Sequence, residues 1–225
     1  MNIQFLGHSC FSIQINDVTI LVDPFISGNS LASHIDIATL KADYILLTHA
    51  HQDHVLDVEV IAERTKAVIV SNYEIAMYYG AKDLNVFALN HGGTFKADEF
   101  SAKYVNAIHT SSFADGTYGG EPGGFVLSSK EKNIYIAGDT ALTMDMKLIP
   151  MSFTLDAAIL PIGDTFTMGV EDAILASDLV ACNTIIGCHF NTFPPIEIDV
   201  NEAKDKFLSK EKELIILEIG EDKNV

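Results

Sequence analysis

The sequence predicts an α/β domain in which two β-sheets lie face to face and helices cover their outer surfaces. The chain has 225 residues, of which 48% are hydrophobic, enough to bury a large core without disulfides or metals. Its apolar runs are short and nearly continuous, as expected of strands that are buried on both faces. These runs alternate with amphipathic segments, and the whole arrangement occurs twice along the chain.

The repeated unit begins with a pair of strands whose second strand ends on an aspartate. In the first half, residues 11–24 alternate apolar and polar side chains, turn once, and end at Asp23. In the second half, residues 125–140 follow the same plan and end at Asp139. Each segment therefore predicts a β-hairpin.

Two further apolar strands follow each hairpin at a nearly constant offset. Residues 43–47 correspond to 156–160, and residues 67–71 correspond to 184–188. Because the matched segments occur in the same order, the chain has the pattern of a duplicated unit. The glycine-rich segment 116–124 predicts a loop between the copies. We therefore expect one domain over residues 1–225, with similar halves at about 1–115 and 125–225.

Segments between the strands have apolar residues at spacings of three and four, which predicts helices with one face on a sheet. These segments are 58–64, 72–79, 169–179 and 201–208. Glu171, Asp172 and Glu202 stand near the starts of the last two, where acidic side chains suit the helix dipole.

The charge and the cysteines limit the possible partners and compartments. A formal net charge of −17 repels phosphate backbones, so nucleic acid is not expected as a partner. A small anionic substrate stays possible, because bound divalent cations would add positive charge locally. No apolar stretch is long enough to span a membrane, and the N-terminus does not resemble a signal peptide. With Cys10, Cys182 and Cys188 at unpatterned spacings, we expect a cytoplasmic protein, and its hydrophobic content allows a homo-oligomer.

The most informative motif is the segment 49–54, which directly follows a predicted strand. In an extended segment His49 and His51 project to the same side. A turn into a helix would let Asp53 and His54 face a neighbouring position. Imidazoles and a carboxylate grouped so closely are ligands for zinc and similar divalent metals. The motif therefore predicts two adjacent metal sites.

More ligand-type residues stand at the ends of other predicted strands, where open α/β sheets usually place their sites. His109 follows the apolar run 104–108, Asp139 ends the second hairpin, and His189 follows the last matched strand. The segment 49–54 alone cannot complete two metal sites, so these residues are the expected additional ligands.

The order His-x-His-x-Asp-His, a distant His, Gly-Asp-Thr and a further His resembles the metallo-β-lactamase superfamily over the whole chain. Residues 7–11, 21–25 and 187–194 are similar to one branch of it. That branch contains small bacterial and archaeal metal-dependent hydrolases similar to ascorbate-6-phosphate lactonase. The resemblance implies a four-layer αββα sandwich of two similar halves.

The resemblance also implies a ligand set for two divalent metal ions. By that set His49, His51 and His109 hold the first ion, Asp53, His54 and His189 hold the second, and Asp139 bridges them. Zinc is expected, and the carboxylate at position 139 makes manganese or iron possible too. An aspartate rather than a cysteine at this position argues against antibiotic hydrolysis.

Two such ions would share a water, lower its pKa and produce a bridging hydroxide that attacks a small ester, lactone or phosphoester. Asp53 is expected to orient this nucleophile and to shuttle a proton. His8 is a second catalytic candidate, unless the backbone of a tight turn holds it. The loops that begin after His109 and His189 are the expected walls of the substrate pocket. Two alternatives stay open: a phosphodiesterase or ribonuclease acting on nucleic acid, and a non-hydrolytic di-metal redox or metal-binding protein.

Other polar residues have less defined expectations. Asp23 is expected to accept a hydrogen bond from a ligand histidine, or else to cap the turn before Pro24. Asp164 ends a strand and lies either near the metal ions or in a turn. His34 and His91 are expected at the surface.

Overall fold

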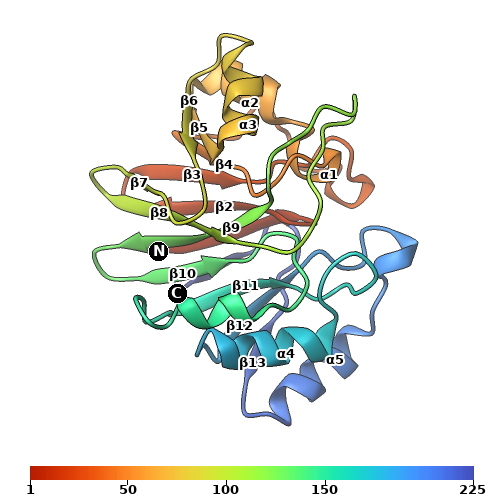
Figure 1. Cartoon of the computed structure of the whole chain (residues 1–225). Coiled ribbons are helices and arrows are strands. Elements are labelled where there is room, and N and C mark those ends of the chain that lie inside the picture. Colours follow the sequence, from red (N-terminus) through yellow and green to blue (C-terminus); the bar gives the residue numbers. More distant parts are fainter.

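The chain folds into four layers, two sheets in the middle and helices on either side (Figure 1). This computed structural model describes residues 1–225. The αββα architecture expected from the sequence is confirmed. None of the helices has the length and apolar character that a membrane crossing would need.

The first sheet has seven strands in the order β14-β1-β2-β3-β4-β5-β6. Its strands are β14 (Asp222–Asn224), β1 (Asn2–Gly7), β2 (Cys10–Ile15), β3 (Val18–Val22), β4 (Tyr44–Leu46), β5 (Val68–Asn72) and β6 (Val86–Leu89). The strands from β14 to β3 pair antiparallel, and those from β3 to β6 pair parallel.

The second sheet repeats this topology with seven strands in the order β13-β12-β11-β10-β9-β8-β7. Its strands are β7 (Thr94–Lys96), β8 (Phe100–Asn106), β9 (Gly123–Ser129), β10 (Asn133–Ile136), β11 (Ala157–Pro161), β12 (Thr184–Cys188) and β13 (Glu213–Ile215). The strands from β7 to β10 pair antiparallel, and those from β10 to β13 pair parallel. The two halves are therefore similar, and β2 to β5 correspond to β9 to β12 as the sequence repeat predicted.

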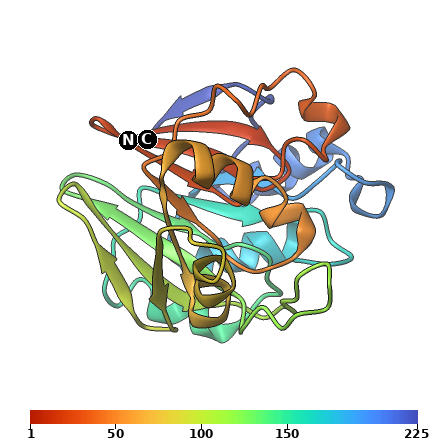
Figure 2. The ribbon, with the colours of Figure 1, turned by 90° about the horizontal axis from the view of Figure 1, so that it is seen from above.

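The boundary between the halves differs from the predicted one. The chain passes from the first sheet to the second between β6 and β7, at residues 90–93, and not at the glycine-rich segment 116–124. The last strand, β14, returns to the edge of the first sheet beside β1, so the two termini lie together (Figure 2). Short edge strands such as β7 and β14 carry too few residues for a sequence pattern. Backbone pairing with their neighbours decides where they lie.

The predicted helices are all present, and each end lies within one residue of the predicted one. They are α2 (Val58–Thr65), α3 (Tyr73–Gly80), α4 (Val170–Leu179) and α5 (Val200–Leu208). Short helical turns also occur: α1 (Gln52–Val55), η1 (Ser30–Ala32), η2 (Met144–Leu148) and η3 (Pro194–Ile196). Helices α2 and α3 pack on the first sheet, and α4 and α5 pack on the second.

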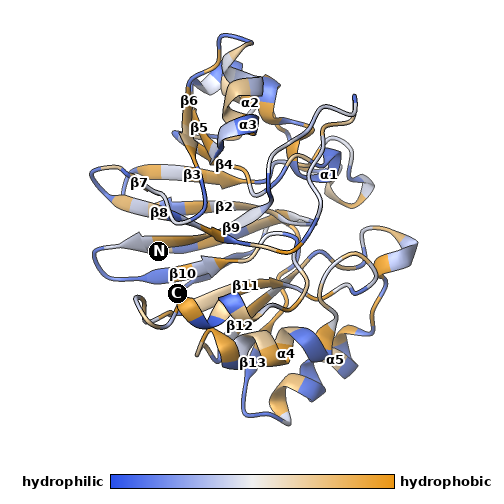
Figure 3. Ribbon diagram, viewed as in Figure 1, coloured by the Kyte–Doolittle hydropathy of each residue, from blue (hydrophilic) through white to orange (hydrophobic).

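The main core cluster lies between the two sheets. Inward-facing side chains such as Ile13, Ile20, Phe125 and Leu127 are fully buried there. The strands are largely hydrophobic, whereas the connecting loops carry many hydrophilic residues (Figure 3). In the first sheet β3 and β4 are parallel, and in the second sheet β10, β11 and β12 are parallel. The loops that follow these strands emerge at one end of the sandwich, beside α1 (Figure 1).

Candidate metal centre

The ligand-type side chains expected from the sequence all lie together at this end of the sandwich. They are His49, His51, Asp53, His54, His109, Asp139 and His189. The first four follow β4 and enter α1, and the others follow β8, β10 and β12. Both halves of the fold therefore contribute to one cluster.

The segment after β4 has the conformation that its spacing predicted. His51 is extended, with φ −63° and ψ 146°, and directly precedes α1. His49 and His51 therefore project to the same side, with Nε2 of His49 at 3.1 Å from Nδ1 of His51. Asp53 and His54 lie on the helical turn itself.

His49, His51 and His109 form the first cluster. Nε2 of His109 lies 3.3 Å from Nδ1 of His51, so ring nitrogens of the three residues converge. Burial lowers the pKa of each of these histidines. Neutral imidazoles with converging lone pairs suit a borderline divalent metal ion.

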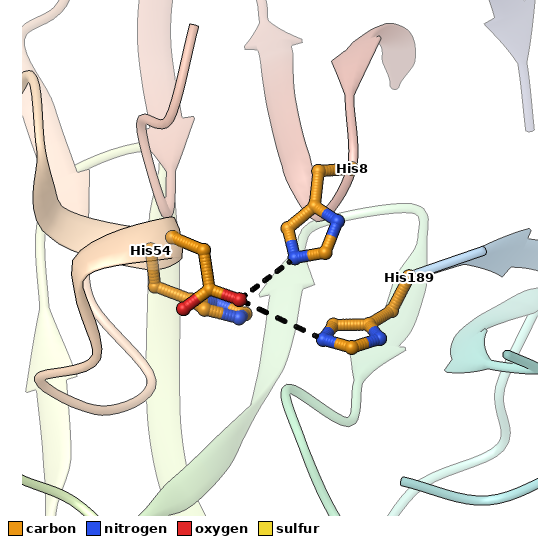
Figure 4. A group of neighbouring side chains, drawn as sticks. His8, His54 and His189 are labelled. Carbon is orange, nitrogen blue, oxygen red and sulfur yellow. Dashed lines mark hydrogen bonds and ion pairs between the residues drawn. The ribbon is translucent and has the colours of Figure 1, made fainter. Parts of the chain in front are cut away.

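The second cluster surrounds the Asp53 carboxylate. Its Oδ2 atom lies 3.2 Å from Nε2 of His8 and 4.0 Å from Nε2 of His189. In Figure 4 the rings of His8 and His189 are directed at one carboxylate oxygen, which their distances identify as Oδ2 of Asp53, and His54 lies beside it. Ligand atoms of all four residues lie within 4.8 Å of one another. The Asp53 side chain is 32% exposed, so the cluster is open to solvent at this carboxylate.

Asp139 lies between the two clusters. Its carboxylate is 3.0 Å from Nε2 of His189, 3.3 Å from that of His54, 3.6 Å from that of His109 and 3.8 Å from that of His49. Burial alone would raise the pKa of Asp139. The neighbouring His54 and His189 outweigh burial and hold this pKa well below its usual range. Asp139 is therefore an anion shared by both clusters.

Hydrogen bonding inside the cluster is incomplete. Nε2 of His54, Oδ1 of Asp139 and Nδ1 of His189 are buried and have no hydrogen-bond partner. The first two atoms lie 3.3 Å apart, but their geometry is not that of a hydrogen bond. Unpaired buried polar atoms are costly and rare in folded proteins. A cation between them would satisfy both, so the residues present fit a divalent metal ion.

Asp23 takes the first of its two expected roles. Its carboxylate accepts hydrogen bonds from the backbone N–H of Thr48 at 2.8 Å and from the Thr48 hydroxyl at 2.6 Å. It also lies 2.9 Å from Nδ1 of His54. Asp23 thus fixes the ring of His54 with Nε2 directed at Asp139, as a metal-binding imidazole requires.

His8 lies in the cluster and is not held by the backbone of a turn. Its Nδ1 is 3.0 Å from the Thr192 hydroxyl, and its ring centroid is 4.2 Å from that of His189. Sequence reasoning missed Thr192, although it belongs to the family-like segment 187–194. It also missed Thr110, whose hydroxyl lies 3.3 Å from Nε2 of His51 and orients that ring.

For the metal-free protein, we expect the free energy of unfolding to decrease as the pH is lowered from 6.5 to about 4, and we attribute part of this decrease to protonation of His8. Burial lowers the pKa of His8 from 6.5 to about 4. The unfolded chain therefore takes up a proton in this window before the folded chain does, so stability rises with pH there. The full shift corresponds to roughly 3 kcal/mol.

His8→Asn should reduce this pH dependence, and asparagine tolerates the φ of 56° at this position. Urea unfolding of chelator-treated protein near pH 4 and near neutral pH measures the change. The His8→Asn variant will keep part of the pH dependence of its stability, because burial also lowers the pKa of His49. The matched control is His34→Asn, which changes an exposed histidine. Equal pH dependence in wild type and His8→Asn would contradict the prediction.

The other polar candidates lie outside the cluster. Asp164 is exposed in a turn, where its carbonyl accepts a hydrogen bond from the N–H of Thr167. His34 is exposed, and His91 is exposed and stacks on Tyr104. The cysteines are all free and buried.

The loop after His109 borders the cluster and is anchored to it. The Ser111 hydroxyl accepts a hydrogen bond from the N–H of Ala50 and donates one to the carbonyl of Gly119. A Cβ at Gly119 would lie 2.3 Å from Cβ of Ala50, so only glycine allows this approach. The loop after His189 lines a cavity of about 520 Å³ beside His8, with Phe190 and Thr192 in its wall.

The fold and the cluster together define a class of protein: metal-dependent hydrolases built on the metallo-β-lactamase sandwich. A family model described as a β-lactamase superfamily domain matches residues 2–189. The chain therefore belongs to the metallo-β-lactamase superfamily.

Curated relatives and solved structures agree with this assignment. A "UPF0173 metal-dependent hydrolase" of Christiangramia forsetii is 62% identical over 222 residues, covering 98% of both chains. Another of the same name, from Methylacidiphilum infernorum, is 46% identical with the same coverage. Among solved structures, the metallo hydrolase Igni18 of Ignicoccus hospitalis matches with a TM-score of 0.90 and 33% identity, covering 99% of this chain and 97% of that one.

Proposed function

We propose that the chain is a dinuclear metal-dependent hydrolase of small esters, lactones or phosphoesters. The observation that carries the proposal is the position of Asp139, whose carboxylate lies within 3.8 Å of histidine nitrogens from both clusters. A shared carboxylate between two sets of ligands is the arrangement that two adjacent ions require.

In this proposal each cluster holds one ion. His49, His51 and His109 would hold the first ion, Asp53, His54 and His189 would hold the second, and the Asp139 carboxylate would be shared between them. The mixture of imidazoles and carboxylates suits zinc, manganese or iron. When bound, two divalent cations lower the pKa of water and polarise the oxygen of the bond to be cleaved.

Asp53 accepts the proton of the attacking water in this proposal, and His8 orients Asp53. Burial raises the pKa of Asp53, but the hydrogen bond with His8 and the nearby His54 together outweigh burial, so the carboxylate is ionised at neutral pH. His8 is neutral there and donates from Nε2 to Asp53 when the Thr192 hydroxyl donates to its Nδ1. This chain of contacts orients the partly exposed carboxylate, which takes the proton of the attacking water.

The proposed partner is a small molecule. The net charge of −17 disfavours the alternative of a nuclease acting on RNA or DNA. The alternative of a non-hydrolytic redox or metal-binding protein has less support, because close relatives carry the name metal-dependent hydrolase. The cytoplasmic location and a homo-oligomeric state stay predictions from the sequence.

Asp23→Asn is expected to weaken metal binding by about 10–100-fold, the usual effect of removing a partner of a ligand histidine. An amide has only one acceptor oxygen and cannot replace both oxygens of the carboxylate, because Oδ1 accepts from the N–H of Thr48 and Oδ2 contacts the Thr48 hydroxyl at 2.6 Å and Nδ1 of His54 at 2.9 Å. Competition with a chromophoric chelator measures the affinity. The control is Asp43→Asn, because Asp43 also accepts from a backbone N–H, that of Thr19, but precedes β4. Unchanged affinity in Asp23→Asn would contradict the role given to Asp23.

The proposal as a whole is tested by elemental analysis of freshly purified protein together with hydrolysis of simple ester and phosphodiester substrates. We expect about two transition-metal ions per chain and hydrolysis that a chelator abolishes and added metal restores. A protein without bound metal, or with hydrolysis that resists the chelator, would overturn the proposal.

A further inference from the structure

We infer that the substrate of this site is an uncharged carboxylic ester or lactone with an apolar body, and not a phosphorylated or otherwise anionic compound. The inference rests on the proposed function and narrows its substrate class. It departs from the phosphorylated substrate that a likeness to ascorbate-6-phosphate lactonase would suggest.

The first observation is the absence of cationic side chains around the cluster. The segments that frame it, directly after β3, β4, β8, β10, β11 and β12, contain no lysine or arginine; Lys41 and Lys147 occur only farther along the connections after β3 and β10. These segments are residues 23–29, 47–51, 107–122, 137–143, 162–169 and 189–193. Proteins recognise a phosphate or carboxylate group at a distance from a metal mainly through arginine and lysine. A substrate with an anionic tail would find no partner here.

The second observation is the acidic character of the same loops. Besides the proposed ligands they carry Asp115, Glu121 and Asp164, and all three are exposed. Two bound divalent ions would be partly neutralised by Asp53 and Asp139. Beyond the ions themselves, an anionic tail would therefore meet like charges, which disfavours its binding.

The third observation is a group of apolar side chains near Asp53, in which Phe25 is buried, Phe193 is half-buried and Leu56 is exposed. The rings of Phe25 and Phe193 lie 5.6 Å and 5.4 Å from the ring of His8, which contacts Asp53. Leu56, which is 37% exposed, belongs to the same group. It lies next to Phe25, because a Cβ added at Gly28 would contact the side chains of both residues.

The cavity beside His8 has the same character. Its volume is about 520 Å³, and about half of its lining residues are hydrophobic, Leu31 and Phe190 among them. Glu218 is its only lysine, arginine, aspartate or glutamate. Ligand sites usually combine such apolar walls with a few polar groups that react or orient. An alkyl or aryl group fits these surroundings, and an anionic group does not.

The test compares two esters that differ only at the far end of the acyl chain. p-Nitrophenyl pentanoate ends in a methyl group, and mono-p-nitrophenyl glutarate ends in a carboxylate. With the metal-loaded protein, we expect kcat/KM to be at least about tenfold higher for the pentanoate, a difference equivalent to 1.4 kcal/mol. Bis(p-nitrophenyl) phosphate, as the phosphodiester probe, should be cleaved more slowly than the pentanoate.

Variants test whether the apolar side chains beside Asp53 cause the preference for the pentanoate over the glutarate. Leu56→Lys and Phe193→Lys each add a cation beside Asp53, and each should narrow the ratio between the two esters by favouring the glutarate. Leu208→Lys adds the same charge at the exposed end of α5, where Leu208 is 72% exposed, and should leave the ratio unchanged. Metal content and melting temperature check that each variant is folded. Of the two substituted positions, Leu56 is the safer, because it is exposed whereas Phe193 is half-buried.

The outcomes separate the inference from the proposed function. Equal or faster hydrolysis of the glutarate, or preferred cleavage of the phosphodiester, would overturn the inference and leave the hydrolase standing. A protein that holds two ions yet cleaves neither ester would also overturn it. A protein that binds no metal and cleaves nothing would overturn the proposed function itself, and the inference with it.

Discussion

Replacing Asp139 with alanine is expected to abolish hydrolysis and to remove most of the bound metal. Its carboxylate lies 3.0–3.8 Å from nitrogens of four histidines and is the only group that contacts both clusters in this way. We expect a loss of at least about a thousandfold in kcat/KM, equivalent to roughly 4 kcal/mol of transition-state stabilisation. Elemental analysis and a steady-state assay on the same preparation measure both effects.

Asp139→Asn separates the charge of the side chain from its shape. The amide keeps the volume of the carboxylate but cannot bridge two cations, so we expect a loss close to that of alanine. The control is Asp145→Ala, because Asp145 is an exposed residue on η2 whose carboxylate accepts a hydrogen bond from the side-chain amide of Asn106. Two retained ions in Asp139→Ala would show that the carboxylate does not bridge, and the assignment of both sites would then be wrong.

Replacing one histidine from each cluster is expected to remove one ion at a time. His109 contacts His51 in the first cluster at 3.3 Å, whereas His189 lies beside Asp53 in the second at 4.0 Å. His109→Ala and His189→Ala should therefore each retain about one ion per chain and lose at least about a hundredfold in kcat/KM, because the reaction uses both ions.

Cobalt substitution distinguishes the two variants. Each should give the absorption spectrum of a single, different site, and the two spectra should sum approximately to that of the wild type. His34→Ala, which changes an exposed histidine, should keep both ions. If either variant lost both ions together, the clusters would form one cooperative site and the one-ion-per-cluster assignment would fail.

Much of the fold could be predicted from the sequence, because it is encoded in local periodicity. The helical spacing of residues 58–64 and 169–179 predicted α2 and α4 to within one residue at every end. The matched hairpins and the strands after them predicted the shared topology of the two sheets. These patterns depend on which side chains face a sheet, and neighbouring residues in the chain already show this.

The types of residue in the site were equally visible in the sequence. Segment 49–54 carries its ligand-type side chains on one extended stretch and one helical turn, so backbone geometry alone brings them together. His109 and His189 could be singled out because each follows an apolar strand. β12 is parallel to β11 and β10, and β8 runs in the same direction as β10 because both are antiparallel to β9. These strands therefore end at one edge of the sheet, and the fold places both residues there.

Only the tertiary structure decided which distant residues meet. His8 contacts Asp53, 45 residues away, and Thr192, 184 residues away, and no periodicity relates these positions. The edge pairing of β14 with β1 was also invisible, because three residues carry no pattern. The sequence by itself determined the elements and the chemical types of the ligands, since both depend on local spacing. The packing of the two sheets determined the neighbours of each ligand, because contacts between separate loops depend on where the whole chain places them.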